Sequence, residues 1–149
     1  MIRNMKKIIF VCHGNICRSP AAEFIAKKLS DKYIFISRAT SYEEIGNDIY
    51  PPMKRELIKN GIPFVRHYAQ RISDEDFDSA DYIFYMDEEN KYSLEKRFPN
   101  SKKLLPIFNF TPCIYKIEDP WYTGRFDIVI GQIKTCVIDI LKALDERII

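Results

Sequence analysis

Residues 11–20 read VCHGNICRSP, so that five residues separate a cysteine, Cys12, from an arginine, Arg18. A thiolate is a strong nucleophile, and the planar guanidinium of an arginine can donate to two oxygens of one phosphate group. A short loop before a helix can turn its backbone N–H groups inward and form a nest for a tetrahedral anion. The spacing therefore indicates a site in which Cys12 attacks an anion that Arg18 holds.

The other residues of this loop suit the same chemistry. Gly14 removes a side chain that would obstruct the nest, and Asn15 is one of the few residues that tolerate a left-handed backbone. Ser19 can donate a hydrogen bond to the sulfur of Cys12. The inward N–H groups, the helix end and Arg18 should together favour the thiolate. The predicted phosphate-binding loop comprises His13, Gly14, Asn15, Ile16, Cys17 and Ser19 around the nucleophile and the arginine.

The elements that must position this loop follow from the hydrophobic pattern. Residues 6–12 form an apolar run typical of a central parallel strand, and a helix is expected to begin at Ser19-Pro20 with Ser19 as its N-cap. Alternating strands and helices predict an α/β sandwich with a mostly parallel sheet, whose ligand site lies at the carboxyl ends of the strands. Further strands are predicted over 33–37, 81–86 and 104–108, further helices over about 51–60, 88–97 and 126–144, and a long loop over 109–124.

Composition narrows the class of protein. The chain has 149 residues, of which 46% are hydrophobic, so we expect a single domain over residues 1–149. The 23 basic and 21 acidic residues give a net charge of +2, which argues against a nucleic-acid binder. No run approaches a membrane span or a signal-peptide core, so a soluble, cytoplasmic protein that does not bind membranes is expected. The cysteines and histidines lack the spacing of a zinc site, and no metal or cofactor is predicted.

The loop resembles that of the low-molecular-weight protein tyrosine phosphatase family, whose signature C-x-G-N-x-C-R-S-P it matches at every fixed position. The resemblance implies a three-layer α/β sandwich, with a four-stranded parallel sheet in the order 2-1-3-4 and helices on both faces. It also implies metal-free hydrolysis of phosphotyrosine in two steps, through a cysteinyl phosphate. The similarity spans nearly the whole chain and includes residues 39–41, 45–47, 67–72, 81–83, 86–90 and 118–120.

The resemblance also assigns catalytic roles. It implies that Cys12 is the nucleophile, that Arg18 clamps the phosphate, and that Asp119 in the Asp-Pro loop is the general acid. Taken alone, Asp119 before Pro120 also fits an ordinary turn cap. Cys17 fits loop packing, or a reversible disulfide with Cys12 that protects the nucleophile from irreversible oxidation.

Aromatic residues are expected to surround the substrate. Trp121 and Tyr122 directly follow the Asp-Pro loop, so they either wall a pocket for a phosphotyrosine ring or pack elsewhere. Relatives carry another aromatic residue near Tyr42, which we expect to line the pocket, although Glu43 takes the closest aligned position. His13 replaces an apolar residue and is expected at the rim, either as a plain exposed side chain or as one whose contact with substrate or acidic groups depends on pH.

Support behind the loop is expected from Ser41 and His67. His67 resembles the histidine that, in the family, holds the loop asparagine, here Asn15, in its strained conformation. The implied partners are phosphotyrosine-containing proteins, with the chain itself a monomer or a weak dimer.

Three other functions share parts of this pattern. Thioredoxin-coupled arsenate reductases share the fold and the loop but need two further cysteines close together, whereas Cys113 and Cys136 are far apart in the sequence. Phosphoarginine hydrolases carry threonine where this chain has Ile16. A catalytically silent phosphotyrosine-binding module would need neither a thiolate nor a proton donor. A tyrosine phosphatase is therefore the favoured interpretation.

Overall fold

A parallel sheet forms the centre of the molecule in the computed structural model, which describes residues 5–149. Its strands are β1 (Lys7–Cys12), β2 (Ile34–Ala39), β3 (Tyr82–Tyr85) and β4 (Leu104–Pro106). They lie in the order β2-β1-β3-β4, and each pair is parallel. The predicted sheet order is confirmed. The helices are α1 (Arg18–Leu29), α2 (Pro51–Lys59), α3 (Asp74–Ser79), α4 (Glu88–Arg97), α5 (Pro120–Thr123) and α6 (Phe126–Asp145).

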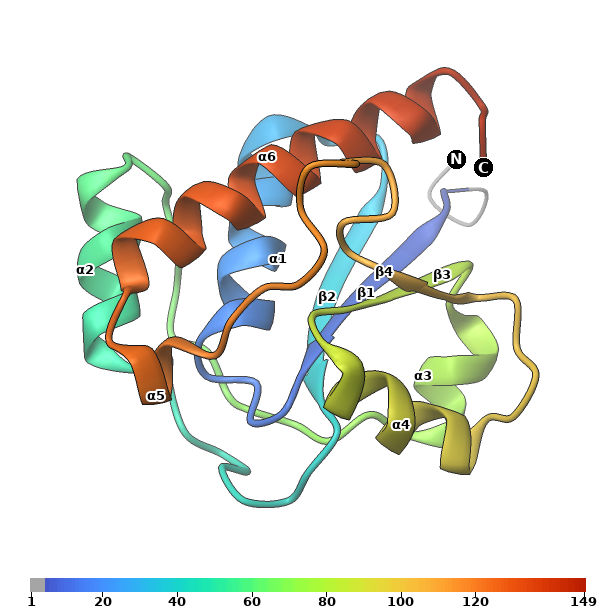
Figure 1. Ribbon diagram of the computed structural model, residues 1–149, viewed down its shortest axis with the longest axis horizontal. Coiled ribbons are helices and arrows are strands. Elements are labelled where there is room, and N and C mark those ends of the chain that lie inside the picture. The colour runs from blue at the N-terminus through green and yellow to red at the C-terminus, as the bar shows by residue number, and fades with distance from the viewer. Residues whose placement is uncertain (1–4) are drawn as a thin grey trace.

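The helices cover the sheet in two layers, as Figure 1 shows. Successive side chains of a strand point to opposite faces, so Ile8 and Phe10 of β1 join a core with α1, α2 and α6. Ile9 and Val11 pack instead with side chains of α3 and α4. Because β1 is covered on both faces, its continuous apolar run was a dependable strand signal.

The carboxyl ends of the strands bring three distant segments together. Cys12 ends β1, and Asp87 follows β3, the neighbouring strand. The N–H of Ile117 donates to the carbonyl of Met86 at 3.1 Å, which attaches the segment before Asp119 to the same edge of the sheet. The sheet therefore places the cysteine loop, the start of α4 and the Asp-Pro loop side by side.

Several element boundaries differ from the prediction. Helix α1 begins at Arg18 with Cys17 as its N-cap, so the assignment of Ser19 as the cap was wrong. Strand β4 ends at Pro106, earlier than predicted, because a turn follows in which Asn109 N–H donates to the Pro106 carbonyl at 3.0 Å. The short helix α5 lies in the segment that was predicted as a long loop.

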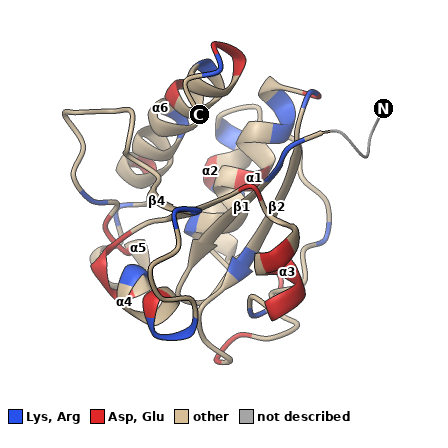
Figure 2. Cartoon of the chain, turned by 90° about the vertical axis from the view of Figure 1, so that its right-hand side faces the viewer, with Lys and Arg blue, Asp and Glu red and all other residues tan. Residues whose placement is uncertain are grey.

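The short helix α3 was not predicted either, and its signals are local. Ser73 and Asp76 form a capping box at its start, as Asp87 and Asn90 do at the start of α4. Figure 2 shows acidic residues on α3 and α4, and both helices carry them in the first turn. Acidic residues in the first turn stabilise a helix, because they interact favourably with the positive end of its dipole. Within residues 5–149 no helix is long and apolar enough to span a bilayer.

Candidate active site

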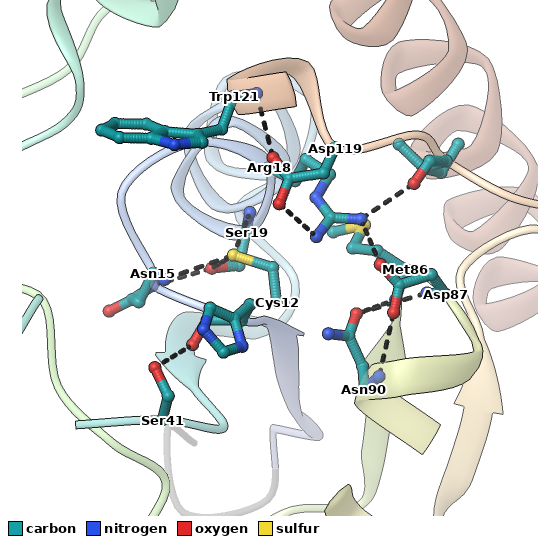
Figure 3. A network of polar contacts seen from close by, with 12 residues as sticks. Cys12, Asn15, Arg18, Ser19, Ser41, Met86, Asp87, Asn90, Asp119 and Trp121 are labelled. Atoms are coloured by element: carbon teal, nitrogen blue, oxygen red, sulfur yellow. Dashed lines mark hydrogen bonds and ion pairs between the residues drawn. The ribbon is translucent and has the colours of Figure 1, made fainter. Parts of the chain in front are cut away.

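The sulfur of Cys12 lies buried beneath the loop that joins β1 to α1. Backbone N–H groups of Asn15 and Ser19 donate to it at 3.3 and 3.4 Å, and the Ser19 hydroxyl lies 3.0 Å away (Figure 3). That hydroxyl oxygen accepts from Asn15 Nδ2 at 2.8 Å, and its own proton has two acceptors in reach, the sulfur at 3.0 Å and the more distant Arg38 carbonyl at 3.4 Å. Three donors therefore converge on Cys12, an arrangement that favours the thiolate.

Asn15 holds the loop in its required shape. Its φ of 60° is the predicted left-handed conformation, and the side chain is fully buried. Asn15 Nδ2 also donates to Ser37 Oγ at 3.0 Å, and Asn15 Oδ1 accepts from the N–H of Gln70 at 3.0 Å. The imidazole Nε2–H of His67 donates to the Asn15 carbonyl at 2.6 Å. These bonds offset the strain of the left-handed backbone.

Asn15→Ala is expected to destabilise the fold by about 2–4 kcal/mol, because it leaves buried polar partners unsatisfied and keeps the strained backbone. Asn15→Gly lacks the same hydrogen bonds but tolerates the positive φ, so its loss should be about 1 kcal/mol smaller. Urea unfolding followed by circular dichroism measures both variants. Unchanged stability in Asn15→Ala would show that the network does not hold the loop.

Burial lowers the pKa of His67 below its ordinary value, although the hydrogen bond to the Asn15 carbonyl opposes this shift. The unfolded chain therefore binds a proton more tightly than the folded chain at this residue. This contribution to stability is complete above the ordinary histidine pKa of about 6.5 and is lost as pH falls below it, through the lower folded-state value. We expect the stability difference between wild type and His67→Gln to shrink from pH 7.5 to pH 5, and a constant difference would contradict this.

Arg18 lies under the loop with only 2% of its surface exposed. Its Nη1 donates to Asp87 Oδ2 at 2.7 Å and to the carbonyl of Ile117 at 2.8 Å (Figure 3). Burial alone would lower the pKa of Arg18, but the charges of Cys12 and Asp87 raise it above its ordinary value. The guanidinium is therefore a fixed cation beside the sulfur.

Asp87 was missed as a site residue, because the sequence suggested only a helix cap. It does cap α4, since Oδ1 accepts from the N–H of Asn90 at 2.9 Å. Its other oxygen, Oδ2, holds Arg18. A signal was available, because Asp87 follows β3 at the edge of the sheet where ligands bind. The Ile117 carbonyl had no comparable signal.

Asp119 lies beside Arg18 and caps a turn, one of the two roles predicted for it. Its Oδ1 accepts from the N–H of Trp121 at 3.0 Å, so the residue does cap a turn, the start of α5. Its Oδ2 lies 3.5 Å from Arg18 Nη2. One carboxyl oxygen is thus fixed by the local backbone, and the other lies within the site.

A cavity of about 140 Å³ opens above the sulfur. Trp121 and Tyr122 line one side of it, and His13, Glu43 and Glu44 line the rim, with Ile16 also in contact. The remaining lining residues are Cys12, Gly14, Cys17, Arg18 and Asp119.

Tyr42 does not belong to this lining within the described residues, so its prediction as a pocket residue is wrong. The side chain is 67% exposed and turns away to Arg71, whose guanidinium lies 4.3 Å from the ring centroid and donates to the hydroxyl at 2.8 Å. Glu43 and Glu44 take its place at the rim. A Cβ at Gly14 would lie 3.3 Å from Cγ of Glu44, so the glycine allows this close approach.

The remaining predicted residues surround the loop. His13 lies at the rim as predicted, but its Nε2 is 2.7 Å from Glu43 of the same chain. Ser41 Oγ donates to the His13 carbonyl at 2.9 Å and thereby braces the loop from outside. Cys17 is a buried free thiol, and burial together with the nearby Cys12 raises its pKa. Cys17 is therefore protonated at neutral pH.

Comparison with known proteins agrees with this geometry. The family model described as low molecular weight phosphotyrosine protein phosphatase matches residues 7–148. The protein named low molecular weight protein-tyrosine-phosphatase YfkJ from Bacillus subtilis is 35% identical over 153 residues, which cover 96% of this chain and 98% of that protein. The mouse low molecular weight phosphotyrosine protein phosphatase is 38% identical over 147 residues, 88% of this chain and 90% of the mouse protein.

Solved structures give the same result. The crystal structure of YfkJ from Bacillus subtilis aligns with a TM-score of 0.90 and 33% identity over 97% of each chain. The protein tyrosine phosphatase from Entamoeba histolytica, solved with Hepes in the active site, aligns with a TM-score of 0.89 and 32% identity, covering 97% of this chain and 99% of that chain. The family model, the sequence relatives and the solved structures each match this chain over nearly its whole length. The chain therefore belongs to the low molecular weight phosphotyrosine protein phosphatase family.

Proposed function

We propose that this protein hydrolyses phosphotyrosine in protein substrates through a phosphorylated Cys12. The observation that carries the proposal is the convergence of three donors on the buried sulfur, with the guanidinium of Arg18 and the carboxyl of Asp119 at the same cavity. A nucleophile, an anion clamp and a proton donor are the parts that phosphoryl transfer to a thiol requires.

In the first step the Cys12 thiolate attacks phosphorus in line with the phenolic oxygen. The S–P bond forms as the P–O bond breaks, and Asp119 gives its proton to the departing oxygen. Without that proton the leaving group would be a phenolate, a strong base whose conjugate acid has a pKa of about 10. Arg18 and the loop N–H groups stabilise the equatorial oxygens while charge redistributes.

In the second step water releases the phosphate. Asp119, now a carboxylate, takes a proton from the water, whose oxygen attacks phosphorus as the P–S bond breaks. Inorganic phosphate leaves, and Cys12 returns to the thiolate. The donors from Asn15 and Ser19 stabilise the sulfur as a leaving group here, as they favour it as a nucleophile in the first step.

The lining of the cavity supports tyrosine as the phosphorylated residue. Trp121 and Tyr122 offer aromatic surface to a ring, and Ile16 adds apolar bulk rather than a polar group for a guanidinium. The cavity lining includes Cys12 and Cys17 but neither Cys113 nor Cys136. Among the described residues, the cavity therefore lacks the third cysteine that the disulfide relay of an arsenate reductase needs.

Turnover of para-nitrophenyl phosphate at mildly acidic pH, in the presence of EDTA, tests the proposed function. A phosphotyrosine peptide should also be hydrolysed, and the matched phosphoserine peptide should react far more slowly because its short side chain does not fill the aromatic pocket. Absence of turnover with both aryl phosphates would leave only a binding role and would reject the proposal.

Reduced thiols are required for this chemistry, which is consistent with a cytoplasmic location.

We also propose that Cys17 protects Cys12 when peroxide is present. Peroxide would oxidise the Cys12 thiolate to a sulfenic acid, and the Cys17 thiol would then displace water to form a disulfide. A reductant of the thioredoxin class would restore both thiols.

The acidic rim should influence which phosphopeptides react. Once a phosphate occupies Arg18, the carboxylates of Glu43 and Glu44 leave the outer cavity negative. Glu43→Lys is therefore expected to raise kcat/KM about three- to fivefold for a peptide with acidic residues beside phosphotyrosine, an effect that high salt should remove. Glu146→Lys makes the same charge change beyond the distant end of α6. An equal gain in that control would show that only net charge matters.

A further inference from the structure

Tyr50 connects the two loops of the active site although it does not line the cavity. Its ring centroid lies 4.7 Å from that of Trp121 and 5.9 Å from that of Phe126. Its backbone N–H donates to the carbonyl of Ile16, in the phosphate loop, at 2.8 Å. One half-buried residue therefore contacts the phosphate loop, the segment after Asp119 and the first residue of α6.

The backbone of Tyr50 is well anchored. It is the N-cap of α2 and is followed by Pro51 and Pro52, whose fixed φ angles limit its movement. Its carbonyl accepts from the N–H groups of Met53 and Lys54 at 2.9 and 3.1 Å. Because Met53 is fully buried in the main core, Tyr50 is attached to the rigid part of the fold.

The segment that carries Asp119 is much less supported by its own contacts. Helix α5 has only four residues, and of these only Pro120 is buried. Trp121 is 50% exposed and Tyr122 is 83% exposed. The contact of Trp121 with Tyr50, whose rings are tilted by 47°, thus links this short helix to the anchored part of the fold.

We infer that Tyr50 is a positioning residue for the proton donor, an inference that rests on the proposed function. Tyr50 contacts the Trp121 ring, and the backbone N–H of Trp121 donates to Asp119 Oδ1 at 3.0 Å. This leaves Asp119 Oδ2 at the cavity, 3.5 Å from Arg18. Without Tyr50, the Trp121 side chain would lose this contact, and the backbone of α5 that binds the Asp119 carboxyl would sample positions away from the leaving oxygen.

A misplaced proton donor has a characteristic kinetic effect. A poor leaving group such as phenolate depends on protonation, whereas p-nitrophenolate is a much weaker base and depends on it less. Loss of Tyr50 should therefore affect phenyl phosphate more than para-nitrophenyl phosphate. A general loss of folded protein would lower both rates by the same factor.

The test compares kcat/KM for these two substrates in wild type and in Tyr50 variants. Tyr50→Ala is expected to lose about tenfold or more with phenyl phosphate but about threefold or less with para-nitrophenyl phosphate, since small displacements of a catalytic group can cost up to about a hundredfold. Tyr50→Phe keeps the ring and should stay within about twofold for both substrates, because the aromatic contact with Trp121 is retained. Tyr33→Ala removes a partly buried tyrosine that donates to Asp145 far from the site. It should change kcat/KM by the same factor for both substrates.

Trp121 is the chain's only tryptophan, so its fluorescence reports the proposed contact without any turnover. Tyr50→Ala should lower the fluorescence anisotropy and shift the emission to longer wavelength, while Tyr50→Phe should not. If Tyr50→Ala does not fold, judged by circular dichroism, Tyr50→Leu keeps apolar bulk without a stacking face and takes its place.

Equal loss with both substrates, or unchanged Trp121 anisotropy in the folded variant, would overturn the inference while leaving the phosphatase intact. Absence of turnover in wild type would instead reject the proposed function, and the inference with it. A leaving-group effect that disappears in an Asp119→Asn background would support it, because two residues acting through one proton transfer are not additive.

Discussion

Cys12→Ser is expected to lower kcat for para-nitrophenyl phosphate by about 10⁵-fold or more, the scale seen when an enzyme loses its nucleophile. A serine hydroxyl under the same donors stays protonated at neutral pH and cannot replace the thiolate. The loop N–H groups and Arg18 remain in place, so inorganic phosphate should still bind. Steady-state kinetics measures the first effect, and calorimetric titration with phosphate measures the second.

Cys113→Ser provides the matched control, because Cys113 is an exposed free thiol that does not line the cavity. Its activity should equal that of wild type. Activity retained in Cys12→Ser above about 1% would contradict the assignment of the nucleophile, because Cys17, the other thiol that lines the cavity, has a raised pKa and is protonated. Loss of activity together with loss of phosphate binding would point to a collapsed loop instead.

Asp119→Asn is expected to lower kcat/KM for phenyl phosphate by about 10²- to 10⁴-fold, the usual contribution of a general acid. Asparagine is also a good N-cap, so the start of α5 should be preserved and the loss should come from the missing proton. The loss with para-nitrophenyl phosphate should be clearly smaller, because its leaving group needs less assistance. A series of aryl phosphates makes this comparison quantitative.

Glu118→Gln tests whether the loss of activity is specific to the Asp119 carboxyl or follows from the removal of any carboxyl in this segment. Glu118 neighbours Asp119 but pairs with Arg125 at 2.8 Å and does not line the cavity above Cys12. Its removal should change kcat/KM by no more than about twofold, because a partly exposed ion pair contributes little. Equal losses for all leaving groups in Asp119→Asn would mean that Asp119 orders the loop without donating a proton.

The fold was readable from the sequence where the physical signal was local and strong. The run that became β1 is buried on both faces, so its composition alone indicated a central strand. The helix predicted over 126–144 is α6, and most of its apolar side chains, which recur at helical spacing, are buried. Helix α5 was missed because four residues carry almost no periodic signal.

The part of the site that is contiguous in the sequence was predictable, and the contacts between distant segments were not. The segment from Cys12 to Ser19 is contiguous, so spacing alone indicated its chemistry. The Arg18 to Asp87 contact joins residues 69 positions apart, and only the β1–β3 pairing makes them neighbours. Such contacts become visible only once the sheet is known.

The error at Tyr42 and the omission of Tyr50 have two different physical causes. Tyr42 lies in an irregular loop, where a shift of one residue decides whether a side chain faces the cavity or Arg71. Neither period 2 nor period 3.6 applies there, so the sequence holds no rule for the direction of a side chain. Tyr50 was missed because its contact with Trp121 joins residues 71 positions apart, so that, like the contact of Asp87 with Arg18, it becomes visible only once the fold is known.

The proposed function depends on a reactive sulfur at Cys12 beneath an anion-binding loop, and the alkylation rate of that sulfur at neutral pH tests this most directly. Iodoacetamide reacts with thiolates, and site-by-site mass spectrometry separates Cys12 from the other three cysteines. We predict that Cys12 is alkylated faster than the exposed thiol of Cys113, and that inorganic phosphate slows the reaction of Cys12 but not that of Cys113. A Cys12 rate no higher than that of Cys113 and unchanged by phosphate would contradict the central claim.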